Sequence, residues 1–340
     1  MVLAGLSAAL LVVAVATPAV AVQPPDNGPI VFTSNRAGGN DVWAMDPDGG
    51  HPRRLTDSDA ADEQAAVSPD GRHIAFASSR TGYSLIWLMD ADGSHPRLLT
   101  GGTGAETEPT WSPDGRLIAY TAQVGGNVDI WVIGLDGRHR RRLTTDTEYA
   151  VDYRPTFSTD GRRVAFTSVR NEDEGENADV WRVDLDGTHL TRLTTKPAFD
   201  TDPAYSPDGR HIVFTSTGDD GNADIWQMNA DGGDLTRLTT DPAFDHAPAF
   251  SPDGSAIVFA SDRRGNSDGI WVMSANGAQQ SCLTLDGATD TDPSWGPAGA
   301  DRPPAPFGQF GPATLLGAVA CAVPDTSHVG GSEALVRGQA

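Results

Sequence analysis

Acidic side chains recur along this 340-residue chain at a spacing of 44 to 48 residues. A regular array of carboxylates can bind a divalent metal ion or the basic side chains of another protein. In three repeats a second acid follows two residues after the first. The first set is Asp62, Glu106, Asp152, Asp200, Asp245 and Asp290, and the second set is Glu108, Asp202 and Asp292.

These acids belong to a longer repeat that predicts strands. After most of them comes an aromatic residue and then the turn Ser-Pro-Asp-Gly, or Ser-Thr-Asp-Gly at Ser158. Short β-branched and aromatic runs bounded by Gly, Pro or Asp indicate four strands per repeat. A period of 44 to 50 residues with four strands predicts a β-propeller. One tryptophan marks each third strand, at Trp43, Trp87, Trp131, Trp181, Trp226 and Trp271, and we expect these rings to belong to the core.

The count of repeats predicts an all-β, six-bladed propeller with four antiparallel strands per blade. The first repeat begins near Gly28 with a second strand, and an isolated first strand follows the last repeat at 290–297. We expect this strand to join the N-terminal blade and close the ring, which leaves no free sheet edge. The predicted propeller is then one domain from 28 to 297.

The repeat resembles that of the TolB family of propellers. Trp111 to Tyr120 match the W-S-P-D-G-x-x-I-A-F part of its signature, Ile86 to Gly93 match the third-strand part, and Arg237 to Thr239 match its end. The resemblance implies a six-bladed, WD-repeat-like propeller. It also implies a protein-binding role, because the propeller of that family engages an envelope lipoprotein. TolB proteins carry an α/β domain before the propeller, whereas here the repeats follow almost directly after the first 21 residues.

The two ends of the chain differ from the repeats. Residues 1–21 are apolar and end in Ala-Val-Ala, which predicts a signal peptide cleaved after Ala21, with an uncleaved membrane anchor as the alternative. Residues 298–340 are rich in Pro, Gly and Ala and predict a flexible tail. We therefore expect an exported protein, secreted, periplasmic or in the cell envelope, with no membrane span in its mature form. Cys282 and Cys321 form a disulfide or remain two thiols, and the sequence favours neither.

The charge balance excludes some partners. Asp and Glu number 46 against 24 Lys and Arg, a net charge of -22, which argues against nucleic acid and anionic membranes. Much of this acid stands in Asp-x-Asp-Gly segments. They lack the further ligands of a calcium loop, so we interpret them as hairpin turns.

The first strands of a propeller line its central channel, so we expect the acids to ring one channel mouth. Such a ring could hold calcium, with His246 as a further ligand, or a basic segment of a partner protein. Alternatively, arginines from the loops between second and third strands pair with acids of a neighbouring blade. Two blades have Val124 and Gly218 where the others have Arg36, Arg80, Arg170 and Arg263.

Catalytic motifs do not appear in the sequence. Neither a G-x-S-x-G elbow nor an H-E-x-x-H segment occurs, and we assign no catalytic residues. The prediction is a monomeric, non-catalytic propeller without a cofactor, acting as a protein-binding or scaffold module through its channel-mouth face. The alternative is a calcium-dependent hydrolase of the lactonase kind, which the acid ring and His246 would serve.

Overall fold

The computed structural model describes residues 26–145, 150–170, 177–218, 220–265, 267–284 and 286–299. The predicted signal peptide and all of the predicted tail after Gly299 lie outside them. Throughout the described ranges the regular structure is β, in 24 strands. None of the described residues forms a helix that is long and apolar enough to cross a membrane.

The strands fall into groups of four, and the name unit is used here for each group. The first unit contains β1 (Asn27–Ser34), β2 (Asp41–Met45), β3 (Arg53–Arg54) and, from the far end of the chain, β24 (Asp290–Pro297). The next two are β4 (Asp62–Val67), β5 (His73–Ser78), β6 (Leu85–Asp90) and β7 (Arg97–Leu98), then β8 (Glu106–Trp111), β9 (Leu117–Val124), β10 (Asn127–Gly134) and β11 (Arg141–Arg142). There follow β12 (Val151–Phe157), β13 (Arg163–Val169), β14 (Ala178–Asp184) and β15 (Thr191–Arg192). The last are β16 (Asp200–Tyr205), β17 (His211–Ser216), β18 (Asp224–Asn229) and β19 (Thr236–Arg237), and β20 (Asp245–Phe250), β21 (Ala256–Ser261), β22 (Gly269–Ser274) and β23 (Ser281–Cys282).

Within a unit, neighbouring strands pair antiparallel in chain order. The predicted pairing of the two chain ends is present: β24 lies beside β1, with Trp295 opposite Ile30 and Asp290 opposite Ser34. A single parallel bridge between Val128 and Val151 joins the β8–β11 and β12–β15 units into one eight-stranded sheet. The fourth strands are shorter than the sequence suggests, with only two residues in each.

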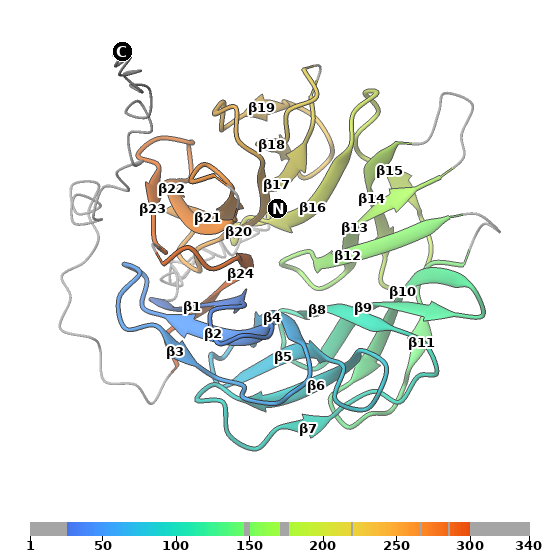
Figure 1. The fold of residues 1–340 in the computed structure, drawn as a ribbon. Helices are drawn as coiled ribbons and strands as arrows, with labels where there is room; N and C mark the ends of the chain where they lie inside the picture. The colour runs from blue at the N-terminus through green and yellow to red at the C-terminus, as the bar shows by residue number, and fades with distance from the viewer. Residues whose placement is uncertain are drawn as a thin grey trace, which may run out of the picture.

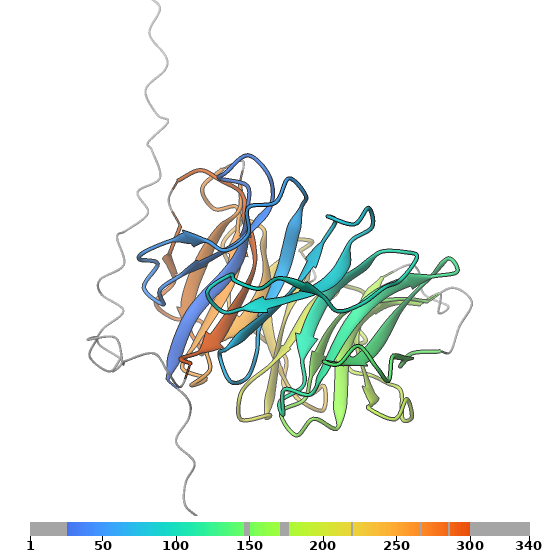
Figure 2. The ribbon, with the colours of Figure 1, turned by 90° about the horizontal axis from the view of Figure 1, so that it is seen from below.

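The units are arranged around a common centre. Figure 1 shows β4, β8, β12, β16, β20 and β24 nearest the centre and the two-residue fourth strands at the outside. In the view from below, the strands run from one face of the molecule to the other (Figure 2). The innermost strands therefore supply the residues that surround the central channel.

The core lies between facing sheets of successive units. Val31 and Val42 of the first unit pack with Ile74 and Phe76 of the second in one buried cluster. The second strands are almost wholly buried, as their unbroken apolar sequences require. The third-strand tryptophans are buried or pack against these clusters, which confirms their predicted place in the core.

Two kinds of turn define one face of the molecule, called here the hairpin face. In the first kind, Ser68 Oγ donates to Asp70 Oδ1 at 2.6 Å and Gly71 takes a φ of 68°, which glycine adopts without strain. In the second, Asp48 Oδ1 accepts a hydrogen bond from the Gly50 amide at 2.9 Å. The Asp-x-Asp-Gly segments are thus turns, as predicted.

The opposite face, called here the connection face, carries the links between units and the loops between second and third strands. Backbone bonds hold these two kinds of segment together: the Asp62 amide donates to Asn40 O and the Glu106 amide to Ser84 O. Each first strand consequently begins against the loop of the preceding unit.

Cys282 lies buried in β23, where its thiol donates to Thr284 O at 2.9 Å. Cys321, the other cysteine of the predicted pair, lies outside the described residues.

Candidate functional site

The first set of acids does not form an open ring. Asp62, Glu106, Asp152, Asp200, Asp245 and Asp290 are all at most 2% exposed. Five of the six are bound by an arginine, and the N–O distances run from 2.5 to 3.1 Å. The pairs are Arg36–Asp290, Arg80–Asp62, Arg140–Glu106, Arg170–Asp152 and Arg263–Asp245.

These arginines belong to the same unit as the acid that they bind. The expectation of pairing with a neighbouring blade was therefore wrong. The reason is geometric, because the loop after a second strand returns over its own unit. Each guanidinium also lies over the third-strand tryptophan of that unit, 4.5 to 4.9 Å from the ring centroid, where cation–π attraction adds to the ion pair.

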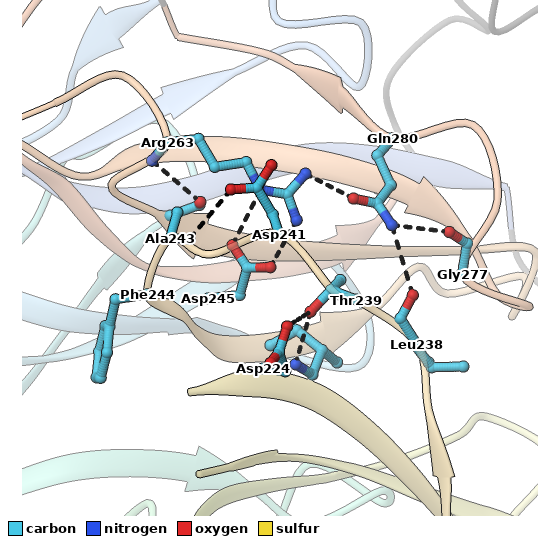
Figure 3. Close-up of polar contacts among 12 residues, drawn as sticks. Asp224, Leu238, Thr239, Asp241, Ala243, Phe244, Asp245, Arg263, Gly277 and Gln280 are labelled. Carbon is cyan, nitrogen blue, oxygen red and sulfur yellow. Dashed lines mark hydrogen bonds and ion pairs between the residues drawn. The ribbon is translucent and has the colours of Figure 1, made fainter. Parts of the chain in front are cut away.

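The pair in the β20–β23 unit illustrates the arrangement (Figure 3). Arg263 donates from Nε to Asp245 Oδ1 at 3.1 Å and from Nη2 to Oδ2 at 2.5 Å, while its Nη1 donates to Gln280. Asp245 is buried and the Arg263 side chain is nearly so. A bidentate guanidinium–carboxylate pair of this kind holds the connection between units against the sheet.

In the β8–β11 unit, where Val124 replaces the usual arginine, a residue that the sequence analysis did not single out takes its place. Arg140 comes from the hairpin between the third and fourth strands and donates to Glu106 Oε1 at 2.6 Å and to the Tyr120 hydroxyl at 2.7 Å. In the β16–β19 unit, where Gly218 stands at that position, no arginine of the described chain bonds Asp200.

The second set of acids converges at the central channel on a residue that the sequence analysis also missed. Arg154 of β12 lies 3.3 Å from Glu108, 2.8 Å from Asp202 and 3.1 Å from Asp292. The four residues come from four different units, so the cluster lies across the channel. The signal that could have identified Arg154 is its position, two residues after Asp152, where three of the other five units carry acids.

A bulge in each first strand turns these side chains inward. The strand registers shift just before this residue, and it has a positive φ in all six units. For Arg154 the angle is 53° and for Asp292 it is 50°. Non-glycine residues adopt this conformation only where the surroundings enforce it, and such sites cluster where function or tight packing demands them.

The cluster contains more negative than positive groups. Burial raises the pKa of Glu108, although the Arg154 guanidinium and the Thr121 hydroxyl oppose the change. Burial lowers the pKa of Arg154, but the charges of Asp202, Asp292 and Glu108 outweigh it and the net shift is upward. Burial and the Asp202 charge raise the pKa of Tyr153 to about 12. A permanently charged guanidinium therefore occupies the centre of the cluster.

This arrangement does not suit a calcium ion at the channel centre, because Arg154 already supplies the positive charge between the carboxylates. Among the described residues no group of three or more His, Cys, Asp or Glu could hold a metal ion. His246 lies away from this centre, with Nε2 3.5 Å from Asp268 and its ring 5.0 Å from that of Phe244. The carboxylate donors at the channel thus do not fit the metal that the hydrolase alternative needs.

A cavity of about 590 Å³ lies in the channel between the Arg154 cluster and the hairpin face. Its floor includes Arg154, Glu108, Asp202 and Asp292, and its walls are prolines and aromatic residues of the first strands, among them Trp111 and Trp295. Both of these indole N–H groups donate to backbone carbonyls, so neither indole offers a free donor to the cavity. The volume is in the range of ordinary ligand pockets.

The comparisons with known proteins agree with this architecture. A family model described as the TolB beta propeller domain matches residues 15–143, 64–171, 150–242 and 218–301. Among curated proteins, none matches the sequence significantly.

Among solved structures, TolB from Acinetobacter baumannii is similar, with a TM-score of 0.69 and 27% identity over 79% of this chain and 66% of that chain. The putative TolB from Agrobacterium tumefaciens has a TM-score of 0.61 and 24% identity, over 77% of this chain and 91% of its own. An oligogalacturonate lyase in complex with manganese shares the fold alone, with a TM-score of 0.52 and 19% identity over 77% of this chain and 74% of that chain. By its repeats, its strands and the matched family model, this chain belongs to the TolB beta propeller domain family.

Proposed function

We propose that this chain is an exported, non-catalytic module that binds a protein partner on its connection face. We infer that the six units are blades of a closed ring, that β24 completes the first blade, and that the chain acts as a monomer in the periplasm or cell envelope. The leader-like residues 1–21 support export.

The observation that carries the proposal is the position of the exposed apolar side chains. In the described part of the chain seven large apolar residues are more than one-third exposed, and five of them lie on the connection face. The largest fractions are 58% for Tyr83, 54% for Phe199 and 49% for Phe244. The five are Tyr83, Val124, Val151, Phe199 and Phe244.

Exposed aromatic residues gathered on one face are typical of protein-binding surfaces, because they bury large areas with little loss of side-chain entropy. Two of them precede acids in similar segments, Pro-Ala-Phe-Asp, at Phe199 and Phe244. The net charge of -22 favours a partner with a basic segment. Of the two sets of first-strand acids, all but Asp200 are engaged in ion pairs that serve the fold, which favours the binding role over a hydrolase site.

The proposal is tested by photo-crosslinking in the cells that produce the protein. A benzophenone amino acid is placed at Phe199 or Phe244 and, as a matched control, at Leu98, which is 41% exposed on the outer strand β7. We expect the same partner to be crosslinked from both phenylalanine positions and not from Leu98. Absence of any protein adduct at the two phenylalanines, or equal adducts at Leu98, would refute the proposed face.

A further inference from the structure

Five units share one polar arrangement on the connection side. A guanidinium binds the first-strand acid and lies over the third-strand tryptophan. In three of them its Nε also donates to a serine at the end of the second strand, as Arg80 does to Ser78 at 2.7 Å. The β8–β11 unit keeps the guanidinium even though the arginine comes from another hairpin, so the arrangement does not depend on one chain position.

The β16–β19 unit keeps every other member of this arrangement. Asp200 opens its first strand, Ser216 ends its second strand, and Trp226 lies in its third strand. Gly218 stands where Arg80 stands in the β4–β7 unit, and Leu235 stands where Arg140 stands in the β8–β11 unit. In the described part of the chain, Trp226 is the one third-strand tryptophan without a guanidinium over its ring.

Asp200 is consequently a buried acid without a bound cation. It is 2% exposed, and its Oδ1 atom has no hydrogen-bond partner among the described residues. Burial raises the pKa of Asp200, and hydrogen bonds from Ser216 and Thr194 and the more distant charges of Lys196 and Arg192 only partly oppose it. A buried carboxylate with an unpaired oxygen raises the free energy of the folded protein. A ligand that supplies the missing positive charge relieves this penalty, which favours its binding.

Asp200 lies at the connection-face end of β16, and the residue before it, Phe199, has an exposed aromatic ring. The Phe199 amide donates to Thr217 Oγ1 at 2.9 Å, and the Thr217 amide donates back to Phe199 O at 3.1 Å. The next residue, Gly218, brings only backbone against the tryptophan, since a Cβ there would lie 3.3 Å from Trp226 Cζ2. Where the other units place an arginine side chain, this unit has a turn without one.

We propose that the β16–β19 unit is an arginine-binding site, in which Asp200, Ser216 and Trp226 receive the guanidinium of an arginine from the partner protein that docks on the connection face. The proposal rests on the proposed function for its partner, but the site itself is tested separately. A planar guanidinium fits because it can bond the carboxylate along one edge while its face lies on the indole, as Arg80 does over Trp87 at 4.7 Å. An ammonium group offers the charge without this shape.

The test uses Nα-acetyl-argininamide as the probe, with Nα-acetyl-lysinamide as the chemical control. Binding to the full chain is followed by NMR at the indole N–H of Trp226, assigned with Trp226→Phe. We expect saturable binding of the arginine probe at about 1 mM, which corresponds to one ion pair and one stacking contact. We expect binding of the lysine probe to be roughly tenfold weaker, because an ammonium cannot bond and stack at once.

Two variants locate the site and one provides a positive control. Asp200→Asn removes the carboxylate charge, and Leu235→Arg supplies a guanidinium from within the unit in the way that Arg140 does, so both should abolish the shift of the neighbouring signals. Arg80→Ala creates the same set of groups in the β4–β7 unit and should add a second binding event at Trp87.

Several results would overturn the inference. One is that the arginine probe binds the Arg80→Ala variant only at Trp87 and not at Trp226. Another is that its binding survives Asp200→Asn, and a third is that the lysine probe binds equally well. Failure of the probe alongside successful crosslinking at Phe199 would reject the arginine site and leave the docking face intact. Probe binding without any crosslink would reject the docking face and the partner's arginine as occupant.

Discussion

Asp200 and Asp245 occupy the same position in adjacent units, and the structure predicts opposite effects when each is replaced by asparagine. Asp245 is 0% exposed and makes two bonds to Arg263, whose side chain is 9% exposed. Asp245→Asn leaves that guanidinium buried without its counter-charge. Breaking one half of a buried pair costs about 3–5 kcal/mol. Because Gln280 and the stack on Trp271 remain, we expect about 3 kcal/mol, or roughly 6–12 °C in Tm for a domain of this size.

Asp200→Asn removes a buried charge that no arginine binds, and the same substitution is expected to stabilise the protein at pH 7. The folded-state pKa of Asp200 is raised above its value in the unfolded chain, so the folded protein holds this proton more tightly. The contribution of this bound proton to the free energy of unfolding is complete below the unfolded-state pKa, near 4. It is lost as the pH rises through the folded-state pKa. The gain from Asp200→Asn should therefore be near zero at pH 4 and grow as the pH rises through the folded-state pKa.

Thermal unfolding followed by circular dichroism at pH 4, 5.5 and 7 measures both variants against the native chain. A matched control is Asp48→Asn, in an exposed hairpin turn, which should shift Tm by little at any of these pH values. Equal destabilisation by Asp200→Asn and Asp245→Asn would refute the reasoning, because the two acids would then be equally well compensated. A neutral Asp245→Asn would refute the assigned strength of the arginine pair.

Three further outcomes are expected, each measured by urea unfolding. Arg154→Met leaves three carboxylates facing one another across the channel, so its loss of stability should be larger at pH 7.5 than at pH 5, where protonation relieves the repulsion, and an equal loss would count against the cluster. Arg54→Leu should cost about 3 kcal/mol, because its partner Asp41 is 1% exposed. Adding Asp41→Leu, which copies the leucine pair of the β4–β7 unit, should recover most of that loss, and additive losses would contradict this. Burial raises the pKa of Asp179 from 3.8 to about 6, against the opposing Arg192, so its contribution to stability is present below pH 4 and lost by about pH 6. Asp179→Asn should flatten the stability curve over that interval, and an unchanged slope would show that another group titrates there.

The repeat and its turns could be predicted because their causes are local. A Ser-Pro-Asp-Gly segment makes its own hydrogen bonds, such as Ser68 to Asp70, and needs no distant residue. The third-strand tryptophans and the pairing of β24 with β1 follow from the pattern in the same way. Five of the six first-set acids open a first strand, and Asp152 is the second residue of β12.

The partners of those acids could not be predicted with the same success. The sequence shows that Val124 stands where an arginine is expected, but only the folded chain places Arg140 over Trp131 and against Glu106. Arg141 and Arg142 follow directly in the sequence and are further candidates for binding Glu106. Only the direction of the turn in the folded chain decides which of the three arginines reaches it. In the β16–β19 unit, Gly218 and Leu235 stand at the two positions that supply the arginine in the other units. Only the structure shows that no other arginine of the described residues binds the acid of this unit instead.

The sequence by itself determined the strands, the turns, the order of pairing and the family, because each depends on contacts within one repeat or between neighbours. The tertiary structure alone decided which charges meet. Arg154 is separated from Asp292 by 138 residues, and the two touch because the bulge in each first strand turns one side chain toward the channel. Ion pairs across the central channel depend on where every unit lies around that channel. The sequence repeat describes each unit but not the arrangement of the units around the centre.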